Sequence, residues 1–186
     1  MKKVSKIDDE NLKAIRENVS RFIKGCAKKY DKSGELVLDI APQVHEGAKS
    51  YFKKSTVQTL DIDEDAGATY TADLCENNSH LISDNHFDYV VCTEVLEHTL
   101  QPFDAAAEIE RILKPGGLAL ISVPFNFRIH GPLPDCWRFT EHGLRALFKD
   151  FEIIQLTPLE SQNRFLMPIH YTLIVKKDFQ LRDYSK

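Results

Sequence analysis

The chain has 186 residues, a usual size for one globular domain with a substantial core. Hydrophobic residues at 42% and charged residues at 28% are typical of a soluble globular protein. The formal net charge of −4 argues against nucleic acid as the main partner, because neutralising phosphates requires a basic face. No internal repeat, linker or low-complexity tract divides the sequence, so we expect one domain over residues 1–186.

Two features of the sequence indicate the compartment. The cysteines lack CxxC spacing, which favours a reducing environment over a disulfide framework. The N-terminus MKKVSKIDDENLK has no apolar signal core, and no run approaches the ~18 apolar residues of a membrane span. We therefore expect a cytoplasmic protein with no membrane span.

The first half of the chain reads as alternating helices and strands. Residues 9–30 place apolar side chains at helical spacing and predict an amphipathic N-terminal helix. ELVLDI predicts the first strand, and residues 48–54 predict the end of a second helix. TVQTLDI predicts the next strand, and a short third strand is expected in ATYTADL.

The most informative stretch is residues 87–125, FDYVVCTEVLEHTLQPFDAAAEIERILKPGGLALISVPF. FDYVVC and LALISVPF are short apolar runs that suit strands buried on both faces. Between them, residues 102–113 have helical spacing, with Pro102 as first helical residue and Lys114-Pro115-Gly116-Gly117 as the stop. A strand-helix-strand unit of this kind implies a parallel sheet with a right-handed crossover.

The last part of the chain predicts one more helix and two strands. Thr140 is a suitable N-cap for a helix through Phe148. FEIIQLTPL and HYTLIVKK follow as closing strands that could pair as a hairpin. The alternation along the whole chain predicts an open α/β sandwich.

TEVLEH, followed by a helix and LKPGG, resembles the fourth and fifth strands of class I S-adenosylmethionine-dependent methyltransferases, particularly the methyltransferase type 11 group. The resemblance implies a Rossmann-like, doubly wound, mostly parallel seven-stranded sheet whose last strand is antiparallel. It also implies an enzyme that uses S-adenosyl-L-methionine as its cofactor.

The segment LVLDIAPQ stands where this family carries its first-strand motif. By resemblance, Asp39 helps to orient the methionine end of the cofactor. The family's usual Gly-x-Gly turn is replaced here by Ala41, Pro42 and Gln43. Glycine permits positive φ and close backbone approach, whereas proline fixes φ and removes a donor. The departure could mean a tighter turn, weaker cofactor binding, or its loss.

Further carboxylates follow the next two strands. Asp61 matches the family position whose carboxylate accepts hydrogen bonds from the ribose diol, with Asp63 as the reserve. The alternative for this acidic cluster is a solvated turn. Asp73 and Leu74 resemble the pair that holds the adenine edge, although a loop Asp can also simply cap a turn.

The resemblance places Thr93 and Glu94 at the methionine and acceptor side. His98 is a candidate general base, because imidazole titrates near neutral pH, or else a structural residue. His130 and Asp135 in the loop PFNFRIHGPLPDCWRFT are the other base candidates, although each could instead fasten that loop.

Three more side chains of this loop are assigned mainly structural roles. We expect Arg138 to pair with a buried carboxylate rather than to hold an anionic acceptor, and Trp137 and Phe139 to cover the sheet edge. His130, Asp135, Cys136 and His142 match no closed zinc pattern, so no metal site is predicted.

The D-x-W-R-F-T ending of the loop resembles type 11 sequences from sugar and cell-envelope pathways, which implies a small-molecule acceptor, such as a sugar or glycan precursor. A partner subunit in a homo-oligomer, or a lid formed by the N-terminal helix, could complete the pocket. The competing hypothesis is a catalytically silent methyltransferase-like binding module. A nicotinamide oxidoreductase ranks last, because no G-x-G-x-x-G follows the first strand.

Overall fold

The computed structural model describes residues 4–42, 47–162 and 164–178. Its described part forms a seven-stranded sheet in the order β3-β2-β1-β4-β5-β7-β6. Strands β1 to β5 pair in parallel, whereas β7 runs antiparallel to both β5 and β6. The strands are β1 (Leu36–Ile40), β2 (Thr56–Asp61), β3 (Tyr70–Thr71), β4 (Phe87–Thr93), β5 (Leu113–Pro124), β6 (Phe151–Leu159) and β7 (His170–Lys177).

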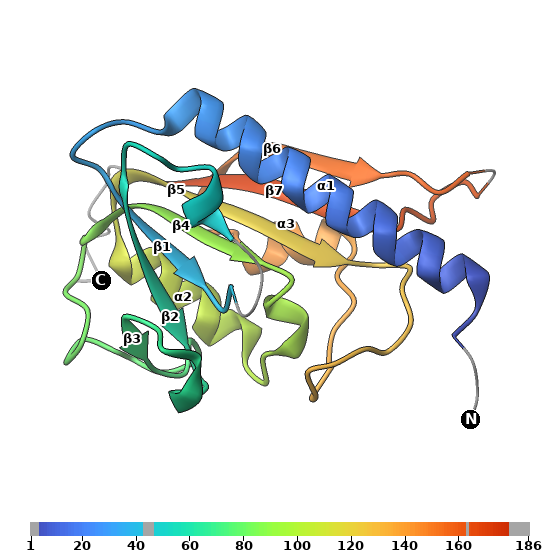
Figure 1. The fold of residues 1–186 in the computed structure, drawn as a ribbon, viewed down its shortest axis with the longest axis horizontal. Coiled ribbons are helices and arrows are strands. Elements are labelled where there is room, and N and C mark those ends of the chain that lie inside the picture. Colours follow the sequence, from blue (N-terminus) through green and yellow to red (C-terminus); the bar gives the residue numbers. More distant parts are fainter. Residues whose placement is uncertain (1–3, 43–46, 163, 179–186) are drawn as a thin grey trace, which may run out of the picture.

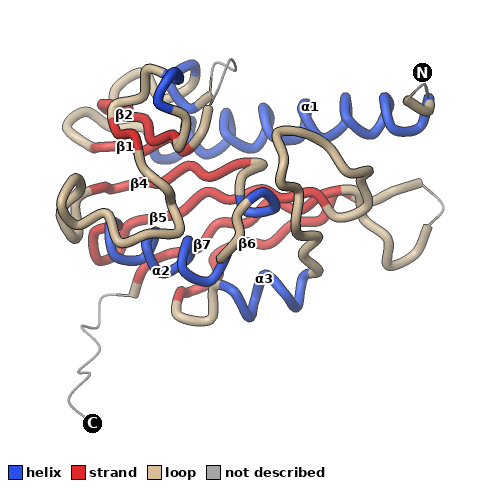
Figure 2. Tube along the Cα trace, turned by 90° about the horizontal axis from the view of Figure 1, so that it is seen from below, coloured by secondary structure: helices blue, strands red, loops and turns tan. Residues whose placement is uncertain are grey.

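Helices cover both faces of this sheet, as Figures 1 and 2 show. The helix α1 lies on one face, and α2 and α3 lie on the other. This arrangement confirms the predicted doubly wound α/β fold, with the antiparallel strand at the expected end of the chain. The helical elements are α1 (Lys6–Tyr30), η1 (Ala48–Ser50), η2 (Glu64–Ala66), η3 (Leu96–His98), α2 (Pro102–Ile112) and α3 (Glu141–Leu147).

The two faces of the central strands carry two separate hydrophobic clusters. Successive strand residues point to opposite faces, so Val37 packs under α1 while Leu38 joins the cluster beneath α2 and α3. In β5, Leu120 likewise belongs to the cluster under α1, and Ile121 belongs to the cluster beneath α2 and α3. Buried side chains on both faces explain why these strands read as continuous apolar runs.

The α1 helix begins at Lys6, three residues before the predicted start. Ser5 is its N-cap, and the Ser5 hydroxyl accepts a hydrogen bond from the backbone N–H of Asp8. The predicted N-cap at Thr140 is also confirmed, because its hydroxyl accepts from the backbone N–H of Gly143. The predicted hairpin of residues 151–159 and 170–177 is present as the pair β6 and β7.

Residues 48–54, predicted to end a second helix, form only one 3-10 turn, η1, and that prediction was wrong for residues 51–54. The carboxylate of Asp31 accepts hydrogen bonds from the backbone N–H groups of Lys53, Lys54 and Ser55. These N–H groups are therefore not available for helical bonding, and the chain passes directly into β2.

The third strand is shorter than ATYTADL and contains only Tyr70 and Thr71. After it, the Asp73 carboxylate accepts a hydrogen bond from the backbone N–H of Cys75 at 2.8 Å, which turns the chain away from the sheet. None of the helices in the described part of the chain has the length and apolar character needed to cross a membrane.

Candidate active site

A cavity of about 740 Å³ lies at the carboxyl ends of the parallel strands. This is where doubly wound sheets bind ligands. The helix α1 lines one side of the cavity, and the loop after β5 lines another. The N-terminal helix therefore covers part of the pocket, as one of the two hypotheses for completing the pocket expected. The residues of α1 that line the cavity are Leu12, Ile15, Arg16, Val19, Ser20 and Ile23.

Three carboxylates from adjacent strands line this cavity. Asp39 belongs to β1, Asp61 ends β2, and Asp73 follows β3. The exposed fraction is 3% for Asp39 and 6% for Asp61, whereas Asp73 is half-buried. Leu74, which is buried, also lines the cavity. The structure therefore brings together the residues that the resemblance assigned to the methionine, ribose and adenine parts of the cofactor.

The Asp39 carboxyl group has an unusual proton affinity. Burial raises its pKa to about 7, although a hydrogen bond from the backbone N–H of Ala48, at 2.6 Å, acts in the opposite direction. Both the neutral and the ionised form of the Asp39 carboxyl group are therefore populated near neutral pH. A cation bound beside it would favour the ionised carboxylate.

The glycine-poor first turn keeps the backbone geometry that glycine usually provides. Ala41 has φ +48°, in the left-handed region. Gly47, with φ +49°, provides the close approach, because a Cβ at this position would collide with the Asp39 carboxylate and lie 2.9 Å from the Pro42 Cβ. Ala41 and Pro42 line the cavity as expected, and Gln43 lies outside the described residues.

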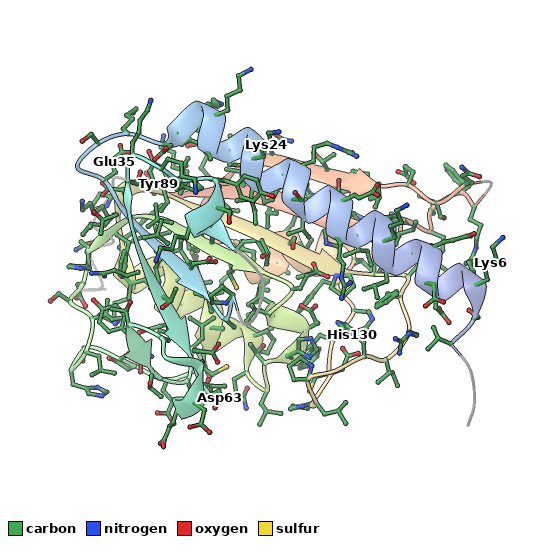
Figure 3. The ribbon with its side chains drawn as sticks, viewed as in Figure 1. Lys6, Lys24, Glu35, Asp63, Tyr89 and His130 are labelled. Atoms are coloured by element: carbon green, nitrogen blue, oxygen red, sulfur yellow. The ribbon has the colours of Figure 1, made fainter. Side chains whose placement is uncertain are left out.

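The structure separates the two aspartates that follow β2. Asp61 lines the cavity, and its Oδ1 accepts a hydrogen bond from the backbone N–H of Asp63 at 3.0 Å. Asp63 is exposed, is absent from the cavity lining, and caps η2 by accepting from the backbone N–H of Asp65. Figure 3 shows Asp63 at the outer end of this region. Asp61 is therefore the better placed of the two for a ligand.

Thr93 and Glu94 line the cavity at the end of β4. Glu94 has φ +56°, a conformation that costs energy for a residue with a side chain and is found preferentially at functional sites. Its Oε1 accepts from the Ser122 hydroxyl at 2.8 Å and lies 2.6 Å from Nε2 of His170. Nδ1 of His170, which is buried, lies 3.0 Å from the Asn18 side-chain amide of α1. These contacts join the end of β4 to β7 and α1.

Two histidines line the cavity on the acceptor side. The rings of His98 and His130 meet edge to face, with centroids 4.9 Å apart. Burial lowers the pKa of His130, and this effect outweighs the opposing charge of Asp135. A neutral imidazole near pH 7 can accept a proton, so His130 meets the chemical requirement for a general base.

Asp135 has a different environment, away from the cavity lining. The Arg138 guanidinium donates to both of its oxygens and holds the pKa of Asp135 well below its usual range. Asp135 also accepts from the backbone N–H of His130 at 2.8 Å. This geometry suits fastening the loop better than moving a proton, and the expected structural pairing of Arg138 is present.

Two aromatic residues attach the loop to the hydrophobic core and to the end of η3. Phe139 is 9% exposed and belongs to the core, in agreement with its prediction. Trp137 is more open, at 41%, but stacks on Phe139 and donates its indole N–H to the Thr99 carbonyl at 2.8 Å.

Sequence patterns did not identify Gly47, Arg16 or the buried Glu97 as parts of this region. Gly47 is separated from Ala41 by five intervening positions, so the usual close spacing of the glycine turn is missing.

Comparisons with known proteins agree with this fold. Residues 20–121 match a family model described as a methyltransferase domain. A comparison with curated protein sequences found no match.

Several solved structures share the fold at low sequence identity. A chain from the complex between the Haloferax volcanii Trm112 methyltransferase activator and a putative methyltransferase aligns with a TM-score of 0.69 and 13% identity, over 90% of this chain and 93% of that chain. The [4+2]-cyclase SpnF aligns with a TM-score of 0.67 and 15% identity, over 86% and 81%. A Methanosarcina mazei S-adenosylmethionine-dependent methyltransferase aligns with a TM-score of 0.64 and 18% identity, over 82% and 97%.

These identities support the fold alone, whereas the family match covers more than half of the 186 residues. Together with the strand order and the carboxylates at the strand ends, it confirms the resemblance found in the sequence. The chain belongs to the methyltransferase type 11 group of class I S-adenosylmethionine-dependent methyltransferases.

Proposed function

We propose that this protein transfers a methyl group from S-adenosylmethionine to a small molecule, with a sugar or glycan precursor as the favoured class of acceptor. The observation that carries the proposal is the set of carboxylates from Asp39, Asp61 and Asp73 around one cavity. Their positions at the ends of three adjacent parallel strands suit a ligand with a cation, a diol and an adenine spaced along its length.

When bound, S-adenosylmethionine supplies a methyl group that is already activated on a sulfonium ion. Asp61 accepts hydrogen bonds from the ribose hydroxyls, and Asp73 and Leu74 hold the adenine edge. The ionised form of Asp39 attracts the ammonium of the methionine end, and Glu94 adds negative charge at the methionine side. Gly47 lines the cavity and packs its backbone directly against the Asp39 carboxylate, where a side chain would collide.

The acceptor side mainly aligns the nucleophile and excludes water. For a hydroxyl acceptor, the oxygen forms a bond to the methyl carbon while the carbon–sulfur bond breaks. The proton of the hydroxyl passes to an imidazole, for which His130 and His98 are the candidates. Asp135 positions His130 through the loop backbone rather than accepting this proton.

The competing hypothesis of a catalytically silent module rested on the missing glycines of the first turn. Ala41 adopts the left-handed conformation there, and Gly47 provides the close approach, so the observed turn does not favour this alternative. The fold alone does not define a reaction, since one similar structure is named as a cyclase. The carboxylates of this chain therefore carry the proposal, rather than its shape.

Calorimetry of the purified protein tests the cofactor directly. We expect saturable binding of S-adenosylmethionine and of its demethylated product, and weak or no binding of NAD. Saturable binding of NAD with none of S-adenosylmethionine would overturn the proposal. A methyl-transfer assay with sugar and glycan-precursor acceptors then tests the substrate class.

Three further features belong to this proposal. The net charge of −4 supports a small-molecule acceptor over nucleic acid. The free thiols of Cys26, Cys75, Cys92 and Cys136 suit a reducing compartment, and we assign the protein to the cytoplasm as a single domain. The alternative is that a partner subunit in a homo-oligomer completes the acceptor side. Light scattering, which gives the molar mass in solution, measures the oligomeric state.

A further inference from the structure

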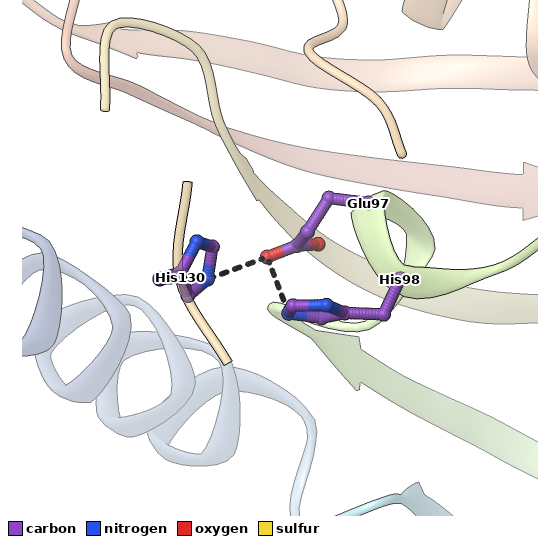
Figure 4. A group of neighbouring side chains, drawn as sticks. All are labelled: Glu97, His98 and His130. Carbon is purple, nitrogen blue, oxygen red and sulfur yellow. Dashed lines mark ion pairs between the residues drawn. The ribbon is translucent and has the colours of Figure 1, made fainter. Parts of the chain in front are cut away.

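A cluster of one buried carboxylate and two half-buried imidazoles lies beside the cavity. Glu97 and His98 belong to η3, and His130 comes from the loop after β5 (Figure 4). One ligand atom from each of the three residues can be chosen so that all lie within 4.8 Å of one another. Glu97 Oε1 is 3.8 Å from Nε2 of His98 and 3.8 Å from Nε2 of His130.

The Glu97 side chain is buried without a described hydrogen-bond partner. It is 0% exposed, and neither of its oxygens accepts a hydrogen bond from any residue that the structure describes. Arg138, a cation of the facing loop, is hydrogen-bonded to Asp135 instead. Buried carboxylates normally accept hydrogen bonds or bind a metal, so one whose oxygens accept no hydrogen bond from the described residues requires an explanation.

The two imidazoles are oriented as metal ligands usually are. Nδ1 of His98 lies 2.9 Å from the Pro134 carbonyl oxygen, so this nitrogen carries the proton and donates it. Nδ1 of His130 lies 3.1 Å from Asp135 Oδ2, within ion-pair distance although not aligned as a hydrogen bond. In both residues Nε2 faces Glu97, while Nδ1 contacts an outer oxygen. Metal-binding histidines are typically held by such outer contacts.

We infer that Glu97, His98 and His130 form a binding site for a divalent transition-metal ion of the Zn²⁺ or Mn²⁺ type. Two imidazoles and one carboxylate match the donors that such ions prefer. Bonds of about 2.1 Å in a tetrahedral complex place ligand atoms about 3.4 Å apart. The two spacings to Glu97 are 3.8 Å and all three ligand atoms lie within 4.8 Å of one another, so closure by at most about 1.4 Å completes the site. This site differs from the set His130, Asp135, Cys136 and His142 that was considered in the sequence, and it departs from the expectation of no metal.

The cavity is on the open side of this cluster. His98 and His130 line the cavity, whereas Glu97 lies behind them. Three protein ligands leave a coordination position for a further oxygen, as in catalytic zinc sites. That position belongs to an oxygen of the acceptor, a role that rests on the proposed methyl transfer, whereas metal binding itself rests on the cluster alone. With the ion bound, Nε2 of both imidazoles would be coordinated, so the ion would favour loss of the hydroxyl proton to water and neither imidazole would act as the general base.

Calorimetry with Zn²⁺ and with Mn²⁺ tests the site after chelator treatment, in the absence of S-adenosylmethionine. We expect one ion per chain, and at least a tenfold loss of affinity for Glu97→Gln, His98→Ala and His130→Ala. His142→Ala is the matched control, because His142 is exposed and lies outside the cluster, and it should bind as the parent does. No binding to the parent, or equal binding to parent and cluster variants, would contradict the site.

Thermal unfolding distinguishes a metal-binding role of the Glu97 carboxylate from a purely structural role. Without metal, Glu97→Gln should unfold at or above the parent temperature, because it removes a buried carboxyl group whose oxygens accept no hydrogen bond from the described residues. Adding the ion should raise the unfolding temperature of the parent and leave that of Glu97→Gln unchanged. A variant that is less stable than the parent without metal, and gains as much from the ion, would refute the inference.

A separate assay tests whether the metal ion contributes to methyl transfer. Removing the metal should lower methyl transfer while leaving S-adenosylmethionine affinity within a few-fold of the holo protein. Metal binding with unchanged methyl transfer would reject that role, and failed S-adenosylmethionine binding would reject the proposed function instead.

Discussion

At the scale of single residues, the buried carboxyl of Asp39 links proton binding to stability. Its pKa is raised from 3.8 to about 7, so the folded protein holds this proton over a pH range in which the unfolded chain has released it. The folded state then binds more protons than the unfolded state, and stability falls as pH rises from about 4 to about 7. A shift of about three units corresponds to roughly 4 kcal/mol.

We predict that Asp39→Asn removes this decline. Below about pH 4 the variant and the parent should be similarly stable, and near pH 7 the variant should be more stable by up to roughly 4 kcal/mol. Denaturant unfolding without cofactor, at several pH values, measures the difference between the two proteins. Parallel stability curves would show that Asp39 titrates normally.

The raised pKa of Asp39 also predicts how the affinity for the cofactor depends on pH. The ionised carboxylate attracts the ammonium of the methionine end, so affinity should rise with pH up to about 7 and then level off. Calorimetry of S-adenosylmethionine binding between about pH 5.5 and 8 tests this, and Asp39→Asn should flatten the profile. A parent profile as flat as the variant's would argue against contact between Asp39 and the cofactor.

Asp61 and Asp63 form a matched pair for testing the ribose site. A hydrogen bond to a charged group contributes roughly 1.5–3 kcal/mol, so Asp61→Ala should weaken S-adenosylmethionine binding about ten- to a hundredfold. Asp63→Ala should have little effect, because Asp63 is exposed and does not line the cavity. His130→Ala should also remain within a few-fold of the parent. Similar losses in the Asp61 and Asp63 variants would show that the effect is one of general charge.

At the scale of elements, the turn after β1 carries backbone strain in place of glycine. Ala41 has φ +48°, and the left-handed conformation costs about 1–2 kcal/mol for a residue with a Cβ. Ala41→Gly should remove this cost and raise the free energy of unfolding by up to about 1 kcal/mol, after the greater freedom of glycine in the unfolded chain is subtracted.

The same substitution within α2 is the control. Ala107 is exposed inside the helix Pro102–Ile112, so Ala107→Gly should lower the free energy of unfolding by about 1 kcal/mol. Denaturant unfolding of both variants gives the comparison. If both substitutions destabilise the protein equally, Ala41 is not strained.

At the scale of the whole molecule, stability is expected to decrease from the centre of the sheet to its edges. The residues of β4 are mostly buried, with β1 and β5 on either side. At the two edges, β3 has only two residues, and β6 alternates between intermediate and exposed positions without a buried one. Opening an edge strand exposes less apolar surface than opening a central one.

We therefore predict that backbone amides of β4 exchange with solvent most slowly and that those of β6 exchange through local opening. Hydrogen exchange followed by mass spectrometry measures both strands in one experiment. Equal protection of β4 and β6 would mean that the sheet opens only as one cooperative unit.

The local patterns of the sequence were sufficient for most of the fold. The apolar runs over residues 87–92 and 118–125 and the helix between them are visible as composition and spacing, because each depends on residues near in sequence. The predicted stop at residues 114–117 was wrong in one respect, because β5 already begins at Leu113 and includes them. Short segments were the main errors. The helix end expected at residues 48–54 is limited to one 3-10 turn, because Asp31, distant in the chain, accepts hydrogen bonds from the backbone N–H groups of Lys53 and Lys54.

For the candidate site, the sequence by itself determined the family, and the resemblance proposed Asp39, Asp61 and Asp73 as cofactor residues. That they line one cavity follows from the parallel sheet, because its strand ends meet at one edge. Only the tertiary structure showed Gly47 against Asp39, the exposure of Asp63, and Glu97 facing His130. These relations join residues from separate loops and strands. They depend on how the chain closes in space, which neither hydrophobic periodicity nor motif spacing records.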